Sequence, residues 1–303
     1  MKSFHTTIFL IFIFLSTTAN AQLNVITTLP DLASITRAIG GERVVVKSIA
    51  RGDQDPHSLQ AKPSFMRDLN RADLLVYNGL ELEVGWLPLL IQGARNPRIT
   101  PGSLGHLDAS IGIPLLEVPT GQIDRSMGDV HTQGNPHYLL DPRNGLIVAQ
   151  TITRKLQELD AAHASTYQKN LDHFQTDLKA HIKTWEIQLA SLQGKPVVTD
   201  HKLWEYLANW LQITIVDQIE NKPGIPPSPH HVATLINRMK TDHIHLLFVA
   251  NYTDPKPAQR VAEQVNAKLL ILPASVDSEK TIASYTSLFQ TIVSQLSTVT
   301  TGS

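Results

Sequence analysis

Residues 163–192 read HASTYQKNLDHFQTDLKAHIKTWEIQLASL. Apolar residues recur in this stretch three or four positions apart, which is the spacing of one face of an α-helix. They are Tyr167, Leu171, Phe174, Leu178, Ile182, Trp185, Leu189 and Leu192. Gly194 and Pro196 then predict the end of the helix and the start of a strand. Thirty residues at the helical rise make a rod roughly 45 Å long.

A rod of this length is long enough to span two lobes. We expect this helix to connect them and to hinder wide hinge motion, in contrast to a flexible linker. The alternative is an ordinary amphipathic helix packed on one lobe, because periodicity indicates a buried face but not what that face contacts.

The segments on both sides of the predicted rod alternate between short β-branched runs and helical patterns. Strands are expected at 23–29, 44–50, 74–77, 196–199, 213–219, 246–250 and 268–272. Helices are expected at 31–39, 63–71, 202–211, 230–240, 257–266 and 279–296. This alternation predicts βαβ units and mostly parallel sheets.

The predicted fold class is therefore α/β, with two (βα)-repeat lobes of mostly parallel sheets joined by a long rigid backbone α-helix. We assign residues 22–162 to the N-terminal lobe, 163–193 to the connecting helix and 194–303 to the C-terminal lobe.

The first 21 residues have the three parts of a secretory signal peptide. Lys2 is the positive head, Ile8 to Leu15 is an unbroken apolar run, and Ala19-Asn20-Ala21 is a small-x-small cleavage site. A membrane anchor is the alternative, but eight apolar residues fall short of the roughly 20 that span a bilayer. We expect removal of residues 1–21 and export to the periplasm. No cysteine follows the cleavage site, so a free protein fits better than a lipid-tethered one.

The composition excludes several functions. The 26 Lys and Arg residues nearly balance the 27 Asp and Glu residues, which argues against nucleic acid as a partner. The chain has no cysteine, so thiolate metal sites and cysteine nucleophiles are excluded. It has 13 histidines, so a transition-metal site would use imidazole and carboxylate.

Four candidate metal ligands stand where parallel strands or turns end. His57 follows the strand expected at 44–50, and His201 follows the one at 196–199. Asp277 follows the strand at 268–272, and His137 lies in a turn before Asp141-Pro142. Because open α/β sheets bind ligands beyond the carboxyl ends of their strands, we expect these residues to meet in a cleft.

Three imidazoles and one carboxylate suit four-coordinate Zn²⁺. Calcium and magnesium prefer oxygen ligands, and manganese prefers more carboxylate. Three of the four residues also have a structural alternative: His57 solvated or capping a helix, His137 bracing a loop, and Asp277 capping the last helix. We interpret His131, six residues before His137, as a solvated loop residue, with an auxiliary or entry ligand as the alternative.

Several motifs together resemble the substrate-binding proteins of bacterial metal-ion ABC importers, the zinc/manganese group. They include Asp55-Pro56-His57, Asn135-Pro136-His137, Asp200-His201 and the run from Pro223 to Ser228. The resemblance implies two lobes joined by a rigid helix, with the metal held in the cleft by His57, His137, His201 and Asp277. It also implies an ABC permease at the inner membrane as the partner.

Manganese-preferring relatives have a glutamate where this chain has His201, so the resemblance favours the zinc-preferring branch. The loop that is long and rich in His and Asp in zinc-specific relatives is short here, from about Pro119 to Gln133, and His131 is its only histidine.

The leading hypothesis is a monomeric periplasmic carrier that captures Zn²⁺ and hands it to a membrane permease. Manganese or iron capture is the alternative within this class. A zinc hydrolase is an alternative from another class, and a structural or adhesive role is a third. The motifs H-E-x-x-H, G-x-S-x-G and the phosphate-binding loop are absent from the sequence, so we predict that the chain is not an enzyme.

Overall fold

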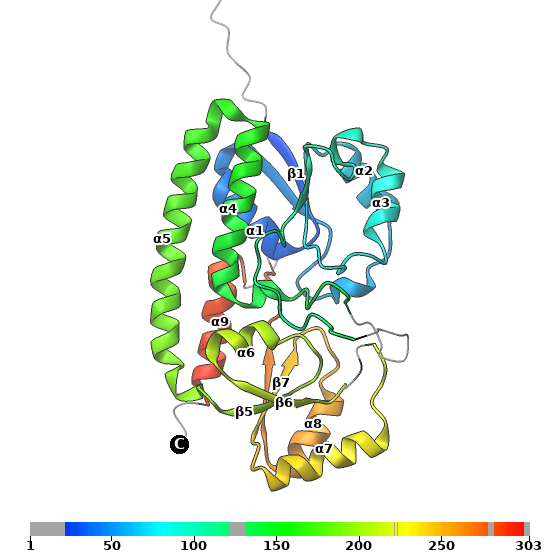
Figure 1. Cartoon of the computed structure of the whole chain (residues 1–303), viewed down its shortest axis with the longest axis vertical. Coiled ribbons are helices and arrows are strands. Elements are labelled where there is room, and N and C mark those ends of the chain that lie inside the picture. The colour runs from blue at the N-terminus through cyan, green and yellow to red at the C-terminus, as the bar shows by residue number, and fades with distance from the viewer. Residues whose placement is uncertain (1–21, 122–130, 221, 223, 278–281, 300–303) are drawn as a thin grey trace, which may run out of the picture.

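The computed structural model of the chain describes residues 22–121, 131–220, 222, 224–277 and 282–299 (Figure 1). The signal peptide predicted at residues 1–21 lies outside the described residues. Among the described residues, no helix is both long and apolar enough to cross a bilayer.

Two four-stranded parallel sheets form the centres of the two lobes. The first has the order β2-β1-β3-β4 and the second has the order β6-β5-β7-β8, so both sheets are built on the same plan. The strands are β1 (Leu23–Thr27), β2 (Val44–Ser48), β3 (Leu74–Tyr77), β4 (His106–Asp108), β5 (Pro196–Thr199), β6 (Thr214–Gln218), β7 (Leu246–Ala250) and β8 (Lys268–Leu272). The predicted α/β fold with parallel sheets is confirmed.

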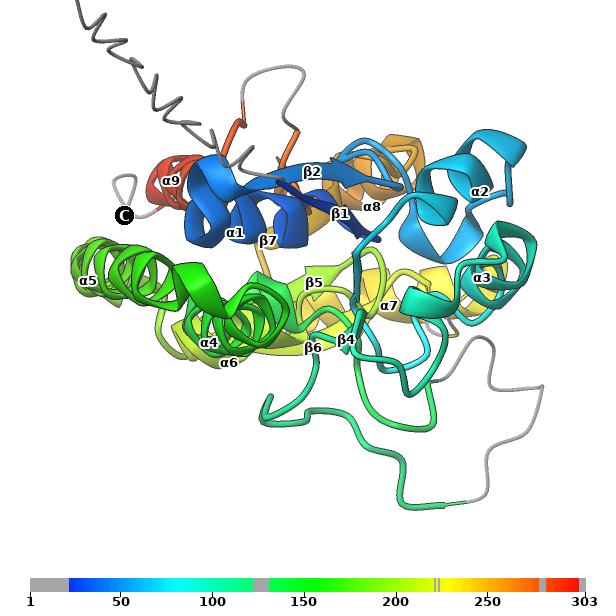
Figure 2. The same cartoon turned by 90° about the horizontal axis from the view of Figure 1, so that it is seen from above.

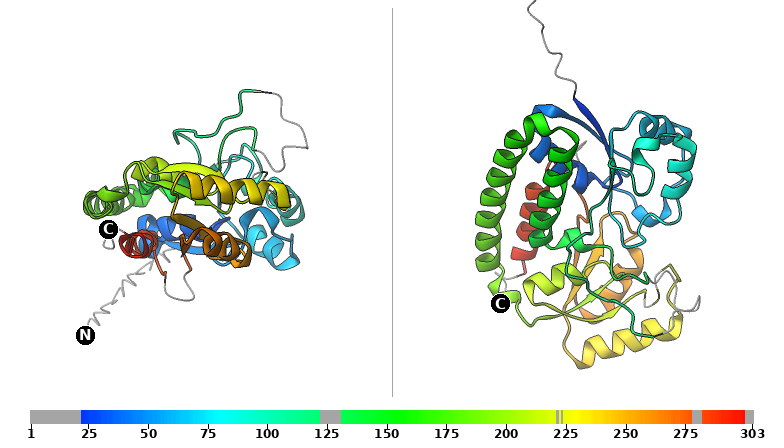
Figure 3. Two further views of the ribbon diagram at one scale, coloured as in Figure 1. Left: turned by 90° about the horizontal axis from the view of Figure 1, so that it is seen from below. Right: turned by 45° about the horizontal axis from the view of Figure 1, so that its top comes forward.

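Helices cover the sheets, as the views along the other axis show (Figures 2 and 3). They are α1 (Pro30–Gly40), α2 (Pro63–Asn70), α3 (Leu87–Ala94), α4 (Pro142–Leu159), α6 (Glu205–Leu211), α7 (Pro229–Thr241), α8 (Lys256–Val265) and α9 (Tyr285–Ser297). Proline stands in the first turn of α1, α2, α4 and α7, where its missing N–H leaves no hydrogen bond unmade. Helix α3 and strand β4 were not predicted, and α4 was expected only as a helix after Asp141-Pro142, without bounds.

The predicted rod is α5 (Ala164–Gln188), a helix of 25 residues followed by a short 3₁₀ turn at Ala190–Leu192. It runs along one side of the molecule past both sheets (Figure 1). Near its start, the amide of Asn170 donates to the main-chain oxygen of Ile39 in α1. Near its end, Glu186 accepts a hydrogen bond from the Trp210 indole of α6. The helix therefore contacts both lobes, and the alternative of packing on one lobe is wrong.

The last helix returns to the first lobe. The backbone N–H of Tyr285, at the start of α9, donates to the Ser34 hydroxyl in α1, and its phenol donates to the main-chain oxygen of Leu139. Trp185 of α5 donates to Gln290 of α9 at 3.1 Å. One continuous hydrophobic cluster consequently includes residues of both lobes, from Val25 to Leu296.

The start of the last helix differs from the prediction. We expected the helix from residue 279, but α9 begins at Tyr285, where Ser284 and Ser287 form reciprocal capping hydrogen bonds. A serine at this position accepts from the free N–H groups of the first turn, so the capping pair sets the boundary. Residues 278–281 lie outside the described residues.

Candidate metal centre

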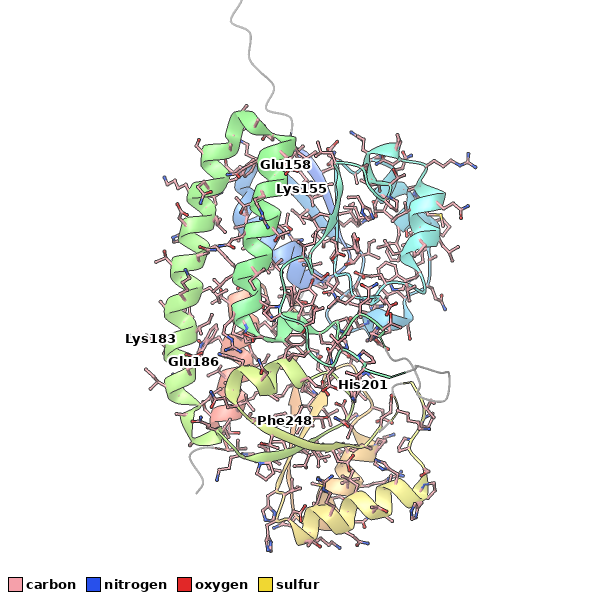
Figure 4. All side chains as sticks on the ribbon, in the orientation of Figure 1. Lys155, Glu158, Lys183, Glu186, His201 and Phe248 are labelled. Atoms are coloured by element: carbon pink, nitrogen blue, oxygen red, sulfur yellow. The ribbon has the colours of Figure 1, made fainter. Side chains whose placement is uncertain are left out.

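Three of the predicted ligands lie together between the lobes. His57 is in the 3₁₀ turn Pro56–Ser58 after β2, His137 precedes the 3₁₀ turn Tyr138–Leu140, and His201 follows β5. The ring centres of His57 and His137 are 5.1 Å apart. The ring of His201 is 6.2 Å from that of His57 and 6.4 Å from that of His137. His201 is labelled at the boundary between the lobes in Figure 4.

The His57 ring is held by a carboxylate two residues earlier. Its Nδ1 lies 2.8 Å from Oδ1 of Asp55, and the same oxygen accepts from the His57 backbone N–H at 2.9 Å. Burial would raise the pKa of Asp55, but the hydrogen bond and charge of His57 outweigh it, so the pKa is lowered. The Trp86 indole braces this turn by donating to the Pro56 oxygen. Nδ1 thus contacts Asp55, and Nε2 is the nitrogen that faces the His131 ring.

His137 is the most deeply buried of the three, with 9% of its surface exposed. Its backbone N–H donates to Oδ1 of Asn135, and the amide of Asn78 donates to the Pro136 oxygen. Burial, together with the neighbouring histidines, holds the pKa of His137 well below its usual value. The imidazole is therefore neutral at physiological pH, which is the form that binds a metal.

His201 faces a carboxylate of its own lobe. Its Nδ1 lies 3.2 Å from Oε1 of Glu220, which also accepts from the Gly224 N–H. Burial alone would lower the pKa of His201, but Glu220, with smaller contributions from Asp200 and Glu205, raises it. This arrangement matches the carboxylate–histidine pairs that fix the orientation of metal-binding imidazoles.

His131 approaches the same group of rings. Its Nε2 lies 3.1 Å from Nε2 of His57, and the ring centres are 5.2 Å apart. The side chain is half-buried. The His131 side chain is therefore a partly exposed loop residue that contacts His57, and its role as an auxiliary ligand stays a prediction. His131 and His57 are 74 positions apart in the sequence, and no periodic pattern predicts a contact between residues so far apart.

Asp277 lies on the loop after β8. Its backbone N–H donates to the Ile282 oxygen, in an isolated antiparallel bridge. This loop packs against the one that carries His57: a Cβ at Gly52 would lie 2.1 Å from the Val276 oxygen, so a glycine is needed there. Asp31 in α1 also accepts from the Val276 N–H and from the Ser275 hydroxyl. The role of Asp277 as a ligand stays a prediction.

A small cavity of about 40 Å³ lies beside His137. Asp31, Asn78, Leu203 and Tyr252 are among its lining residues, so both lobes contribute to it. Its volume is sufficient for an ordered water, for which Asp31 and Asn78 offer polar atoms in a mainly apolar lining. Burial raises the pKa of Asp31 to about 6, although its hydrogen bonds to Ser275 and Val276 favour the charged form.

The distances between the imidazole rings can be compared with those that tetrahedral zinc coordination requires. Zn–N bonds of about 2.0–2.1 Å at tetrahedral angles place two ligating nitrogens about 3.3 Å apart and their ring centres about 5 Å apart. The pairs His57–His137 and His57–His131 match this spacing, whereas His201 is roughly 1 Å too distant. Accordingly, within the described residues no three His, Asp or Glu side chains already have their donor atoms arranged to hold a metal ion.

Comparison with known proteins assigns the class. The family model for zinc-uptake complex component A, periplasmic (ZnuA), matches residues 25–299, and the chain belongs to this family. It is a substrate-binding protein of a metal ABC transporter that works outside the cytoplasm with a membrane permease, and it is not an enzyme.

Individual relatives are more distant. A metal ABC transporter substrate-binding lipoprotein, ScbA of Streptococcus cristatus, is 28% identical over 82% of this chain and 78% of its own length. The manganese ABC transporter substrate-binding lipoprotein of Streptococcus gordonii is 26% identical over the same shares. A zinc-bound ZnuA deletion mutant has the same fold, with a TM-score of 0.74 and 23% identity over 91% of this chain and 97% of that one.

Proposed function

We propose that this protein captures Zn²⁺ in the periplasm, in the cleft between its lobes, and delivers it to an ABC permease at the inner membrane. The observation that carries the proposal is the grouping of His57, His137 and His201, two of which direct Nδ1 to a carboxylate. Such carboxylates fix the tautomer, so that Nε2 is available to the ion. Asp277 is the sequence-predicted candidate for the fourth position.

The donor set supports zinc over manganese. Imidazole is a favoured ligand of Zn²⁺, whereas Mn²⁺ favours carboxylate, carbonyl and water oxygens. The manganese-named relatives share the fold family but are less than 30% identical to this chain. The imidazole of His201, in place of the glutamate expected in manganese-preferring relatives, supports a different preference here.

Capture would need a small movement. His201 lies roughly 1 Å beyond tetrahedral spacing from the other rings, and α5 ties both lobes along their side. We therefore propose that the loop of His201 moves toward His57 and His137 around the ion, with little rotation of the lobes.

The test is a competition for the metal-free protein, residues 22–303. It is dialysed against equal concentrations of Zn²⁺ and Mn²⁺, and bound metal is measured by elemental analysis. We expect one zinc and almost no manganese per chain. His57→Ala should lose zinc, while the control His245→Ala, at an exposed histidine directly before β7, should retain it. A wild-type protein that takes up manganese at least as well as zinc would overturn the proposal.

Export and assembly are further parts of the proposal. Cleavage after Ala21 would give a mature periplasmic chain that begins at Gln22, and we propose that this chain is a monomer. N-terminal sequencing of protein from the periplasmic fraction and light scattering of the purified protein test the two points separately.

A further inference from the structure

The position of His131 is set by its neighbour. The backbone N–H and the hydroxyl of Thr132 donate to the two carboxylate oxygens of Glu81, at 2.5 and 2.7 Å. Glu81 belongs to the turn after β3 and has a left-handed backbone conformation, with φ of 65°. The residue after His131 is thereby anchored to the first lobe, and the histidine is directed at His57.

The distance between His131 and His57 matches the distance between two imidazole ligands of one zinc ion. The two Nε2 atoms are 3.1 Å apart, close to the edge of about 3.3 Å that tetrahedral Zn–N bonds define. The ring centres, 5.2 Å apart, have the same spacing as those of His57 and His137. Two rings thus lie at ligand spacing from His57, and one of them belongs to a residue outside the predicted set.

The charges around the rings also suit a shell of neutral donors. Asp55 accepts from Nδ1 of His57, and Glu220 accepts from Nδ1 of His201. These two carboxylates lie behind the imidazoles, and their two negative charges would balance the two positive charges of the ion, so an anionic ligand is not needed for neutrality.

We infer that His131 is the fourth ligand of the bound ion, in the position that the sequence assigns to Asp277. This inference rests on the proposed function, because it concerns the same cleft and the same cation. The shell then consists of four imidazoles, from His57, His131, His137 and His201. The chain would thus hold zinc with nitrogen donors throughout, a set that disfavours manganese.

The test counts imidazole ligands by X-ray absorption at the zinc edge, on the zinc-loaded chain of residues 22–303. We expect four imidazoles in the wild type, three in His131→Ala and four in Asp277→Ala. Zinc affinity, measured by competition with a chelator, should fall at least tenfold in His131→Ala, and more than it falls in Asp277→Ala. His245→Ala serves as the matched histidine control, and thermal unfolding of each metal-free variant checks that it folds.

The two proposals fail in different ways. If the wild type binds no zinc, or prefers manganese, the proposed function fails. If the wild type binds zinc through three imidazoles and an oxygen, and Asp277→Ala rather than His131→Ala loses a ligand, the function stands and the assignment of His131 is overturned.

Discussion

The side-chain amide of Asn135 donates across the interlobe boundary to the main-chain oxygen of Lys202, at 3.1 Å. The same amide approaches Glu205, and its oxygen accepts from the His137 backbone N–H. One residue thus links the loop of His137 to the loop of His201. This geometry means that the relative position of two candidate ligands depends on a side chain that does not itself bind metal.

Replacing Asn135 by Asp should loosen this link. The substitution keeps an acceptor for the His137 N–H, but it removes the donor to Lys202 and adds a charge near Glu205. We expect a loss of about 1–3 kcal/mol in the free energy of unfolding and weaker zinc binding, both measurable by denaturant titration and chelator competition. An unchanged zinc affinity would mean that the link does not position the ligands.

Replacing His201 by Glu should shift metal preference toward manganese. A carboxylate oxygen is a better ligand for Mn²⁺ than imidazole is, so zinc uptake should fall relative to manganese uptake in the dialysis competition. His201→Gln, which is neutral, is the matched control and should lower the binding of both ions. A glutamate variant that keeps the zinc preference of the wild type would show that selectivity lies elsewhere in the cleft.

Zinc affinity should depend on pH through His201. Because the pKa of His201 is raised, a proton competes with the ion below that pKa, and affinity should fall about tenfold per pH unit there. The lowered pKa of His137 keeps it neutral, so it adds no such penalty near neutral pH.

The substitution Glu220→Gln tests whether the raised pKa of His201 causes the pH dependence of zinc affinity. It removes the charge that raises the pKa of His201, so the decline in affinity should begin at a lower pH than in the wild type. Chelator competition between pH 5.5 and 8 measures the two profiles, and a shift of the decline to higher pH would contradict the assignment.

Stability without metal should depend on pH through Glu83. This buried carboxylate accepts from the N–H groups of Asn78 and Gly79, but burial still raises its pKa to about 7. A raised pKa means that the folded protein binds the proton more tightly, so this group's favourable contribution is lost as pH rises toward and through 7.

Glu83→Gln removes this titration and isolates its effect. Between pH 5 and 8, the wild type should lose up to about 3 kcal/mol of unfolding free energy relative to the variant. Denaturant titrations of both metal-free proteins across this range give the difference. A difference that is constant with pH would contradict the raised pKa.

Much of the fold could be predicted because its elements carry strong local signals. The strands β3, β5, β7 and β8 begin and end as expected, since each is a short apolar run between breaking residues. Helix α3 was missed because Leu87–Ala94 is apolar on nearly all sides and contains Pro88 and Gly93. Strand β4 has three residues, too few for any alternation to be recognised.

The contacts within the candidate site could be predicted from the sequence only in part. The positions of His57 and His201 after strands indicated that they would face the cleft, and their rings do adjoin. The contact of His131 with His57, and the pairing of Glu220 with His201, depend on how loops from separate elements pack. Contacts that arise only from tertiary structure cannot be predicted from the periodicity of the sequence. The roles of these residues as metal ligands stay predictions.

The return of α9 to the first lobe also bears on how the chain acquires its structure. Tyr285 is buried against Ser34, Leu139 and Gly145, so residues near the C-terminus fill a space in the lobe that is made first. That lobe lacks part of its interior until the final segment has been synthesised. Folding should therefore be late and cooperative across the whole polypeptide, rather than proceeding one lobe at a time behind the ribosome or the export channel.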